Sequence, residues 1–343
     1  MKSVYIGKRL VGPGQPPLVI AEVGINHEGS YRKAIQCVDA AAAAGAECIK
    51  FQCHITEAEM IPADIKPRNA SGERLWDIIK RCELTEKEER SVKEYCRQKD
   101  IMYLSTPFSR EAADRLNAMG VEAFKVGSGE CNNYPLIDHI AAKKKPVILS
   151  TGMNDIKSIK KSVSIIKKNG CPLILMHCTS MYPTPYEKVR LGAIEELMNI
   201  FNVPVGLSDH SMGIYTCLGA VVTGASLLEK HFTVTRSWTG PDIPISIEPQ
   251  ELTELIRGSY AIFLAMNGRK SILPEEKPVI DFAYASIVSI CDIPKNTVFS
   301  TDNIWVKRPG TGIPAMDLSK IMGKRAKKNI KANSLISRSD IKG

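Results

Sequence analysis

The sequence predicts an α/β protein: a (β/α)8 TIM barrel followed by a small C-terminal β-rich domain. Three observations predict the barrel. Eight short apolar runs alternate with amphipathic stretches between residues 17 and 233, the runs lack clean polar alternation, and each ends in small or polar residues. Runs of this kind are typical of parallel strands covered on both faces. Eight strand–helix units in about 250 residues match a closed barrel.

The elements follow one another in a regular order. Residues 4–17 predict a hairpin, because Gly12-Pro-Gly supplies a turn before the first core strand. The expected strands are residues 18–24, 48–54, 102–107, 123–128, 147–152, 173–179, 203–210 and 226–233. The expected helices include residues 30–44, 85–98, 110–119, 156–168 and 249–265. Thr85 and Glu88 form a capping box that opens one of them.

A doubly wound sheet is the alternative fold, but no G-x-G-x-x-G pattern follows the first strand. Residues 55–80 form a long insertion after the second strand, and such loops usually shape a barrel's site.

The barrel with its hairpin is expected to end near residue 266, and residues 267–280 form a linker rich in proline and charge. Residues 281–343 make the small domain. Within it, residues 292–304 (DIPKNTVFSTDNI) resemble residues 329–341 (NIKANSLISRSDI) at an offset of 37 residues. The near-repeat predicts two similar turn units packed as pseudo-symmetric halves.

Composition excludes several classes of protein. No apolar run reaches the roughly 18–20 residues of a membrane span, and the N-terminus lacks a signal-peptide core. We therefore expect a cytoplasmic protein. The ten cysteines contain no C-x-x-C pair, which favours buried reduced thiols over zinc or disulfides. The net charge is +9, but aromatic interleaving and nucleic-acid motifs are missing, so a solvated basic face is favoured over nucleic-acid binding.

Polar residues gather where the expected strands end, and in a barrel these ends carry the site. They are Glu22, Lys50, Gln52, Ser105, Thr106, Lys125, Ser128, Ser150, Thr179, Ser180, Ser208, His210 and His231. An unpaired lysine inside an apolar strand is costly. Lys50 and Lys125, together with hydroxyls on other strands, therefore predict a cradle for a dianion such as a phosphate near a carboxylate. The alternative is that the lysines pair with carboxylates of the protein.

Two imidazoles, His210 and His231, suit Mn, Fe, Co or Zn better than calcium. Two protein ligands leave an open site that can polarise a carbonyl. Glu22 is then a general base or acid, or orients a water, although a structural acceptor is the alternative. His54 and His177 are weaker candidates, and His27 and His139 are read as loop or helix residues. The residues alone indicate metal-assisted chemistry between an anionic, phosphorylated small molecule and a carbonyl compound.

Ten motifs carry a resemblance to a known family. They are residues 21–30 (AEVGINHEGS), 50–55 (KFQCHI), 104–110 (LSTPFSR), 124–136 (FKVGSGECNNYPL), 149–153 (LSTGM), 182–186 (YPTPY), 206–210 (GLSDH), 229–232 (EKHF), 240–243 (GPDI) and 305–310 (WVKRPG). With these motifs the chain resembles the bacterial sialic acid synthases (N-acetylneuraminate synthases) essentially from end to end.

The resemblance implies a TIM barrel joined to an antifreeze-like (SAF) domain, in a domain-swapped homodimer whose SAF domain covers the partner's site. It implies that phosphoenolpyruvate condenses with open-chain N-acetylmannosamine to give N-acetylneuraminate and phosphate. A divalent ion, Mn2+ with Mg2+ or Co2+ as substitutes, is implied at His210 and His231. Neither a nucleic acid nor a membrane is an expected partner.

The resemblance also assigns individual residues. Those matching phosphoenolpyruvate contacts are Lys50, Thr106, Lys125, Ser128, Ser150 and Ser208. Those matching positions around the sugar are Gln52, Asn69, Tyr182, Asp242 and Phe282. Glu22 matches the carboxylate that handles the water, and Arg308 matches the arginine that reaches in from the other subunit. The implied catalytic set is Glu22, Lys50, Lys125, His210 and His231.

Some residues depart from the pattern of the family, and all lie on the sugar side. They are Ser180, Phe51 and Cys53, and the Pro244-Ile-Ser that follows the GPDI motif. The departures leave a second acceptor open, a 6-deoxy-diacetamido hexose that gives legionaminic or pseudaminic acid, because one hydroxyl contact can shift such preference strongly. A hypothesis from a different class is a non-catalytic sugar- or ice-binding protein that uses the small domain.

Overall fold

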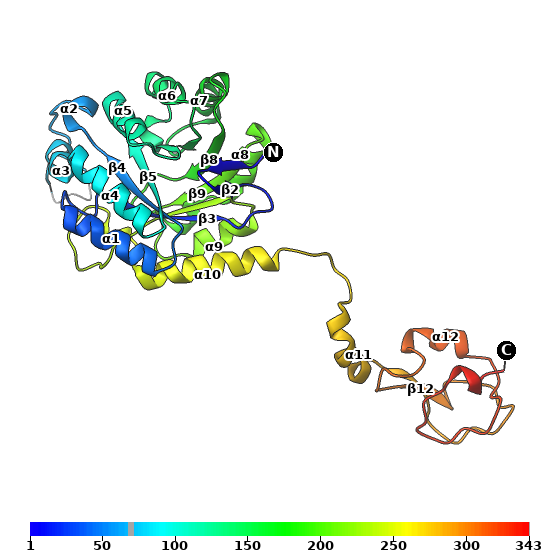
Figure 1. Cartoon of the computed structure of the whole chain (residues 1–343). Helices are drawn as coiled ribbons and strands as arrows, with labels where there is room; N and C mark the ends of the chain where they lie inside the picture. The colour runs from blue at the N-terminus through cyan, green and yellow to red at the C-terminus, as the bar shows by residue number, and fades with distance from the viewer. Residues whose placement is uncertain (68–71, 343) are drawn as a thin grey trace. The chain divides into compact units, whose positions relative to one another are not determined.

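The computed structural model describes residues 1–67 and 72–342 and confirms the (β/α)8 barrel (Figure 1). Its strands are β3 (Leu18–Gly24), β4 (Cys48–Cys53), β5 (Met102–Pro107), β6 (Phe124–Val126), β7 (Val147–Ser150), β8 (Leu173–Cys178), β9 (Val205–Asp209) and β10 (Leu227–His231). Neighbouring strands pair in parallel throughout the order β5-β4-β3-β10-β9-β8-β7-β6. β5 and β6 lie side by side, which brings the ring together.

Helices cover the outside of this ring. They are α1 (Tyr31–Ala43), α2 (Thr56–Glu59), α3 (Leu75–Cys82), α4 (Glu86–Gln98), α5 (Arg110–Ala118), α6 (Tyr134–Ala141), α7 (Ile156–Lys168), α8 (Gly192–Phe201), α9 (Tyr215–Val222) and α10 (Pro249–Ala265). The expected capping box of Thr85 and Glu88 opens α4. The insertion at residues 55–80, expected as a loop, contains the short helix α2 and most of α3, which continues to Cys82.

Side chains alternate between two apolar cores. On β3, Val19, Ala21 and Val23 face the helices, whereas Leu18 and Ile20 face the barrel interior. This period of two is the ordinary geometry of a strand. The interior of the barrel is apolar at the N-terminal ends of the strands. These residues fill the core there, and polar groups occupy the same inward face only toward the C-terminal ends.

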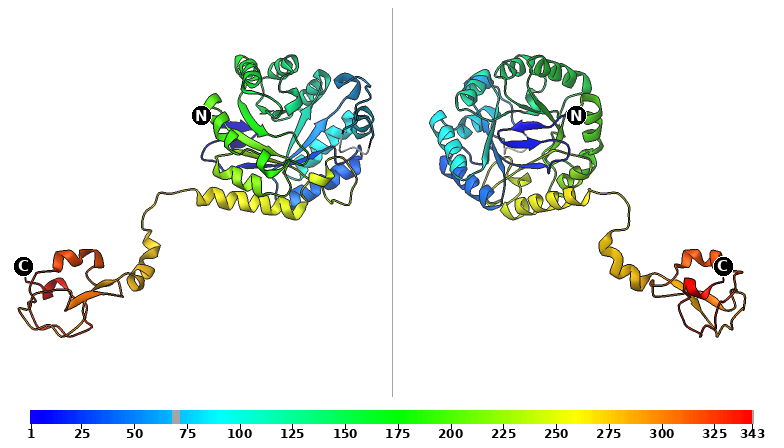
Figure 2. Two further views of the ribbon diagram at one scale, coloured as in Figure 1. Left: turned by 180° about the vertical axis from the view of Figure 1, so that it is seen from behind. Right: turned by 45° about the vertical axis from the view of Figure 1, so that its right-hand side comes forward.

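The predicted hairpin forms from β1 (Val4–Ile6) and β2 (Arg9–Val11) and closes the N-terminal end of the barrel (Figure 2). Its buried residues Val4, Ile6 and Val11 join the apolar cluster of the barrel interior. The barrel is therefore sealed at one end and open for chemistry at the other.

Residues 268–343 form a second compact unit with its own apolar core around Ile287, Phe299 and Ile336. It contains η4 (Pro274–Glu276), α11 (Lys277–Ala283), β11 (Ser286–Ser289), β12 (Ile304–Lys307) and α12 (Leu318–Ile321). The expected linker at residues 267–280 thus includes η4 and the start of α11.

The near-repeat of this unit is visible in its pairing. Ile293 and Ile330, 37 residues apart, exchange two backbone hydrogen bonds of 2.8 Å each. Asn296 and Asn333, at the same offset, both have left-handed backbone, with φ of 73° and 56°. One equivalent pair is therefore hydrogen-bonded and another shares its backbone conformation, which supports the predicted pseudo-symmetric halves.

Within residues 1–67 and 72–342, no helix is long and apolar enough to cross a membrane. The ten cysteines, all in described segments, are free thiols, and nine of them are buried. Cys291 is exposed, which corrects the expectation for that one residue.

Candidate active site

The inward face of the strands turns polar at the C-terminal end of the barrel. Ile20 is followed two residues later by Glu22, and Cys48 by Lys50 and then Gln52. The same step of two leads to Thr106, Lys125, Ser150, Cys178, Ser208, Glu229 and His231 on other strands. Because the strands are parallel, these ends meet at one rim.

Two lysines and two carboxyls form the centre of this rim. Lys50 Nζ lies 2.7 Å from Glu22 Oε2 and 3.6 Å from Glu229 Oε2. Lys125 Nζ lies 3.0 Å from Glu229 Oε1, which also accepts a hydrogen bond of 2.9 Å from Ser208. All four charged side chains are nearly inaccessible to solvent. The lysines are thus paired with carboxylates, the alternative that the sequence left open, and Glu229 was not among the expected site residues.

The surroundings shift the pKa values of the two carboxyls, Glu22 and Glu229, in opposite directions. Burial raises the pKa of Glu22 to about 7, and the ammonium of Lys50 opposes this only in part. Burial also acts on Glu229, but Lys125 and Lys50 outweigh it and hold its pKa below the usual value. Two carboxyls with opposite shifts indicate a division of roles. Glu229 is the permanent anion, and Glu22 is the group that can exchange a proton near neutral pH.

The expected hydroxyls line the same cavity. Thr106 accepts a hydrogen bond of 3.2 Å from Lys50, and Ser128 accepts one of 3.0 Å from the backbone N–H of Gly152. The buried hydroxyl of Ser150 has no hydrogen-bond partner among the described residues. A buried hydroxyl without a partner is costly, so it suggests a ligand that completes the bond.

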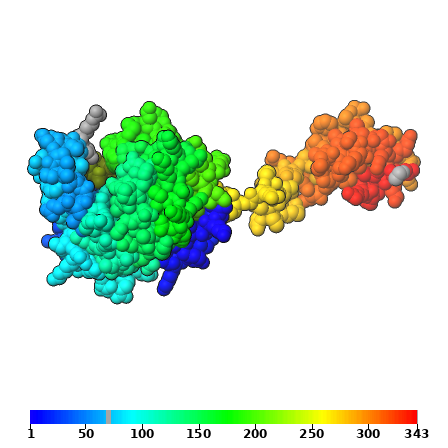
Figure 3. Space-filling view, turned by 90° about the horizontal axis from the view of Figure 1, so that it is seen from above, coloured from blue at the N-terminus to red at the C-terminus, as the bar shows by residue number. Residues whose placement is uncertain are grey.

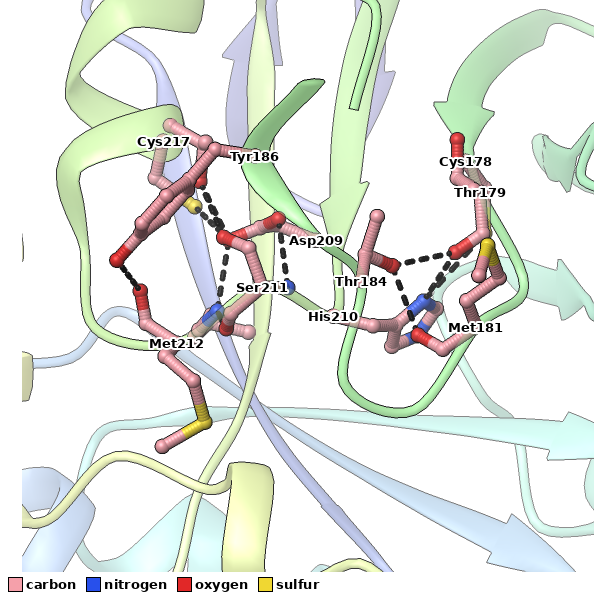
Figure 4. Close-up of polar contacts among 12 residues, drawn as sticks. Cys178, Thr179, Met181, Thr184, Tyr186, Asp209, His210, Ser211, Met212 and Cys217 are labelled. Atoms are coloured by element: carbon pink, nitrogen blue, oxygen red, sulfur yellow. Dashed lines mark hydrogen bonds and ion pairs between the residues drawn. The ribbon is translucent and has the colours of Figure 1, made fainter. Parts of the chain in front are cut away.

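His210 and His231 lie next to each other, with ring centroids 5.4 Å apart. The Tyr182 ring stands over both, at 4.2 Å from His210 and 6.1 Å from His231. Figure 4 shows the ring of His210 beside Thr179, whose carbonyl oxygen lies 3.2 Å from Nδ1. A hydrogen bond from Nδ1–H to that carbonyl leaves the other nitrogen, Nε2, with a free lone pair.

A divalent ion fits these residues. Nδ1 of His231 is buried without a hydrogen-bond partner among the described residues, and Asp242 Oδ2 lies 3.8 Å away. Burial, together with His210, lowers the pKa of His231, so its ring is neutral, as a metal ligand must be. For His210, contact with Cys178 outweighs burial and raises the pKa, so a cation would compete with a proton there. The described part of the chain holds no cluster of three metal-binding side chains, so any ion would need ligands from substrate or water.

A cavity of about 440 Å3 joins the lysines, the hydroxyls and the histidines. On one side the insertion adds an apolar wall of Met60, Leu75 and Ile79. In Figure 3 a notch separates the blue segment that contains α2 from the green part of the barrel. Ser180 lies in the lining as well.

The remaining expected site residues are not among the described residues that line the cavity. Asp242 is half-buried beside His231, and desolvation raises its pKa to about 6. Asn69 lies outside the described residues. Phe282 and Arg308 belong to the second unit, where Phe282 is exposed.

Several lining residues were not expected from the sequence. Glu229 stands two residues before His231 on β10, so the alternation of the strand was the signal that could have found it. Cys178 follows Met176 in the same way on β8. His54 was only a weak candidate, and its partner Glu59 gave no signal because it lies in the insertion. The alternation of inward and outward residues along a strand was thus informative, whereas the contacts made by residues of the insertion could not be predicted from the sequence.

Comparisons with known proteins show the family of the chain. Residues 37–271 match the NeuB family, and residues 284–342 match the SAF domain. The chain belongs to the NeuB family. The stated resemblance to sialic acid synthases is confirmed.

Relatives of this NeuB-family chain include synthases of sialic-acid-type sugars. An uncharacterized protein of Methanocaldococcus jannaschii is 41% identical, with 100% of each chain covered. The N,N'-diacetyllegionaminic acid synthase of Campylobacter jejuni is 38% identical, over 93% of this chain and 98% of the relative. The crystal structure of N-acetylneuraminic acid synthetase from Leptospira borgpetersenii, in complex with citrate, has 34% identity and a TM-score of 0.75. It covers 81% of this chain and 95% of that one.

Proposed function

We propose that this NeuB-family enzyme condenses phosphoenolpyruvate with the open-chain aldehyde of an N-acetylated hexosamine, giving a 2-keto sugar acid and phosphate. The observation that carries the proposal is the placing of Lys50 and Lys125 in one cavity with Glu22 and the adjacent pair His210 and His231. Two buried ammonium groups suit a phosphate with a nearby carboxylate.

In this reaction C3 of phosphoenolpyruvate attacks the aldehyde carbon, whose oxygen takes up a proton. Positive charge develops at C2, water adds there and loses a proton, and the C2 centre expels phosphate. Lys50, Lys125 and the hydroxyls of Thr106, Ser128, Ser150 and Ser208 hold the phosphate and carboxylate. Glu22 accepts the proton of the water, and its raised pKa suits this exchange near neutral pH. Preorganised charge of this kind stabilises the transition state without reorganisation.

The balance of charge supports a divalent ion, Mn2+ in the first place, at His210 and His231. Glu229 already neutralises part of the charge of the two lysines. A phosphorylated carboxylate therefore brings negative charge that the lysines alone do not balance. When bound, the ion would polarise the aldehyde as a Lewis acid.

Two acceptors compete. N-Acetylmannosamine, giving N-acetylneuraminate, is the first candidate. A 6-deoxy-diacetamido hexose, giving legionaminic or pseudaminic acid, is the second, and the apolar wall of Met60, Leu75 and Ile79 favours it because a methyl group loses nothing against apolar side chains. The relative from Campylobacter jejuni, named for diacetyllegionaminic acid, also favours it.

The acceptor site also includes a partner subunit in our proposal. Arg308 of one chain would meet the sugar in the barrel of the other within a domain-swapped homodimer, and Phe282 would lie near it. Gln52, Asn69, Tyr182 and Asp242 would complete the sugar contacts.

A product assay tests the proposal. The purified chain with phosphoenolpyruvate and Mn2+ is given each acceptor in turn, and phosphate release and the keto acid product are measured. We expect turnover with at least one of them, loss of turnover with EDTA, and recovery on addition of Mn2+.

Each outcome decides something. Product only from N-acetylmannosamine selects the first acceptor, and product only from the deoxy sugar selects the second. Activity that survives EDTA would contradict the proposed requirement for a divalent ion. No product from any acceptor would overturn the reaction and favour a non-catalytic sugar-binding protein.

A further inference from the structure

A row of buried polar side chains leads from the insertion to Glu22. His54 Nδ1 lies 2.9 Å from Glu59 Oε1, and His54 Nε2 lies 2.9 Å from Gln52 Oε1. Gln52 Nε2 in turn lies 3.3 Å from Glu22 Oε1. The side chains of His54 and Glu59 are only 4% and 3% exposed, although both line the cavity.

The chemistry of the partners fixes the direction of these hydrogen bonds. The carboxylate of Glu22 forms an ion pair with Lys50 at one oxygen, and at the other it accepts a hydrogen bond from the amide NH2 of Gln52. The amide oxygen of Gln52 is then left for His54, whose Nε2 must carry the hydrogen. On the opposite edge of the ring, Nδ1 lies 2.9 Å and 3.0 Å from the two carboxylate oxygens of Glu59.

The ring of His54 is also held by packing. It stacks on Phe108 with ring centroids 4.5 Å apart and an interplanar angle of 12°. Its orientation is therefore set by an aromatic face, a carboxylate and an amide together. A buried side chain held in three ways can fix its neighbour in turn.

We propose that His54, oriented by Glu59, is a positioning residue that locks the amide of Gln52 and through it aims Glu22 at the reacting centre. This inference rests on the proposed function of Glu22. Glu59 immediately precedes Met60 of the apolar wall. The same chain of contacts therefore links the acceptor side of the cavity to the carboxyl that handles the proton.

The first test is His54→Phe, which keeps an aromatic ring against Phe108 and removes both ring nitrogens. Because a small misplacement of a reacting group lowers the rate steeply, we expect kcat to fall about 10- to 100-fold. The KM for phosphoenolpyruvate should stay within about twofold, since the contacts of the lysines and hydroxyls are untouched.

Matched variants separate positioning from folding. His139→Phe is the control, because His139 also pairs with a carboxylate, Asp114 at 2.8 Å, but lies on α6 outside the cavity lining. It should leave kcat unchanged. Glu59→Gln keeps a hydrogen-bonding group beside Nδ1 and should lose less activity than Glu59→Ala. An equal loss in both Glu59 variants would contradict the proposed role of the hydrogen bond.

The decisive comparison uses a Gln52→Ala background. If His54 acts through the amide, His54→Phe lowers kcat no further there than about twofold. Losses that multiply in the double variant would overturn the proposal, because they would show an independent structural effect.

A readout without turnover guards against variants that do not fold. In the native chain with labelled histidines, 15N spectra at neutral pH should show a hydrogen on Nε2 of His54, assigned by its absence from His54→Phe or, if that variant is unfolded, from His54→Gln. An Nε2 without hydrogen overturns the inference. An inactive native enzyme with every acceptor would overturn the proposed function but leave this spectrum as the test of the contacts.

Discussion

Glu22 and Glu229 face the same cavity from neighbouring strands, yet their carboxyls behave differently. Among the described residues, Glu229 meets Lys125, Lys50 and Ser208, whereas Glu22 meets Lys50 and the amide of Gln52. The difference in partners explains why burial prevails at Glu22 and not at Glu229.

This difference predicts the pH dependence of the reaction. The pKa of Glu22 is raised to about 7, so below that value it is protonated and cannot accept a proton from water. As a base it is active when ionised, so kcat/KM, which reports the free enzyme, should rise as the pH increases through about 7. Glu22→Gln should lower kcat by about 100- to 10,000-fold and remove this rise. The measurement is a pH profile of both proteins, and a native profile that falls through the same range would make Glu22 an acid.

The alternation of strands explains which residues could be predicted. Glu22, Lys50, Lys125, Ser208 and His231 stand at strand ends on the inward face, and the structure brings them together. The ionisation of these side chains could not be predicted, because it depends on distances between residues of strands that are far apart in the sequence. His54 became informative only once Glu59 and Gln52 were placed beside it.

At the scale of the elements, β9 and β10 are joined behind the histidines by a fully buried ion pair. Lys230 Nζ lies 2.7 Å from Asp209 Oδ2, and Asp209 also accepts hydrogen bonds from Ser211 and Thr216. Figure 4 shows Asp209 and Ser211 on the same segment as His210. Asp209 and Lys230 immediately precede His210 and His231, so the pair holds the two strand ends at a fixed separation.

Breaking this pair should destabilise the barrel. Lys230→Met leaves a buried carboxylate without its cation, and we expect the free energy of unfolding to fall by about 3–5 kcal/mol. The measurement is urea denaturation. The double variant Asp209→Leu with Lys230→Met should lose less than Lys230→Met alone, because no unpaired charge remains.

An exposed pair provides the comparison. Arg97 and Glu94 lie 2.6 Å apart on the surface of α4. Arg97→Ala should change the free energy of unfolding by no more than about 1 kcal/mol. If Lys230→Met lowers the free energy of unfolding by no more than Arg97→Ala does, water reaches Asp209.

The strands and the five expected helices were predictable, whereas the two short helices of the insertion were not. The strands and the five expected helices follow from apolar runs and periodicity, with ends shifted by a few residues. Helices α2 and α3 have four and eight residues. Isolated helices of this length are marginal, so they form through tertiary packing that a local pattern does not encode.

At the scale of the whole molecule, the chain consists of two units, each with its own core. The near-repeat in the second unit could be read from the sequence, because equivalent positions carry similar residues. The proposed exchange of this unit between subunits could not be derived from composition or periodicity. Eight residues, from Met266 to Leu273, connect α10 to η4, and such a segment can span up to about 28 Å. That reach permits a swap.

Mixed dimers test the swap directly. Arg308→Ala removes the arginine proposed to enter the partner's site, and Glu22→Gln removes the proton acceptor of its own barrel. In a mixed dimer, a swap joins the intact Glu22 of one subunit with the intact Arg308 of the other, whereas without a swap every site lacks one of them. Random pairing of equal amounts should therefore restore about a quarter of the native turnover, since half of the dimers are mixed and each has one complete site. Coexpression of differently tagged subunits followed by two-tag purification isolates the mixed dimers, which in the product assay should show about half of the native turnover because one of their two sites is complete. Mixed dimers no more active than the separate variants would place Arg308 in its own subunit's site or in none.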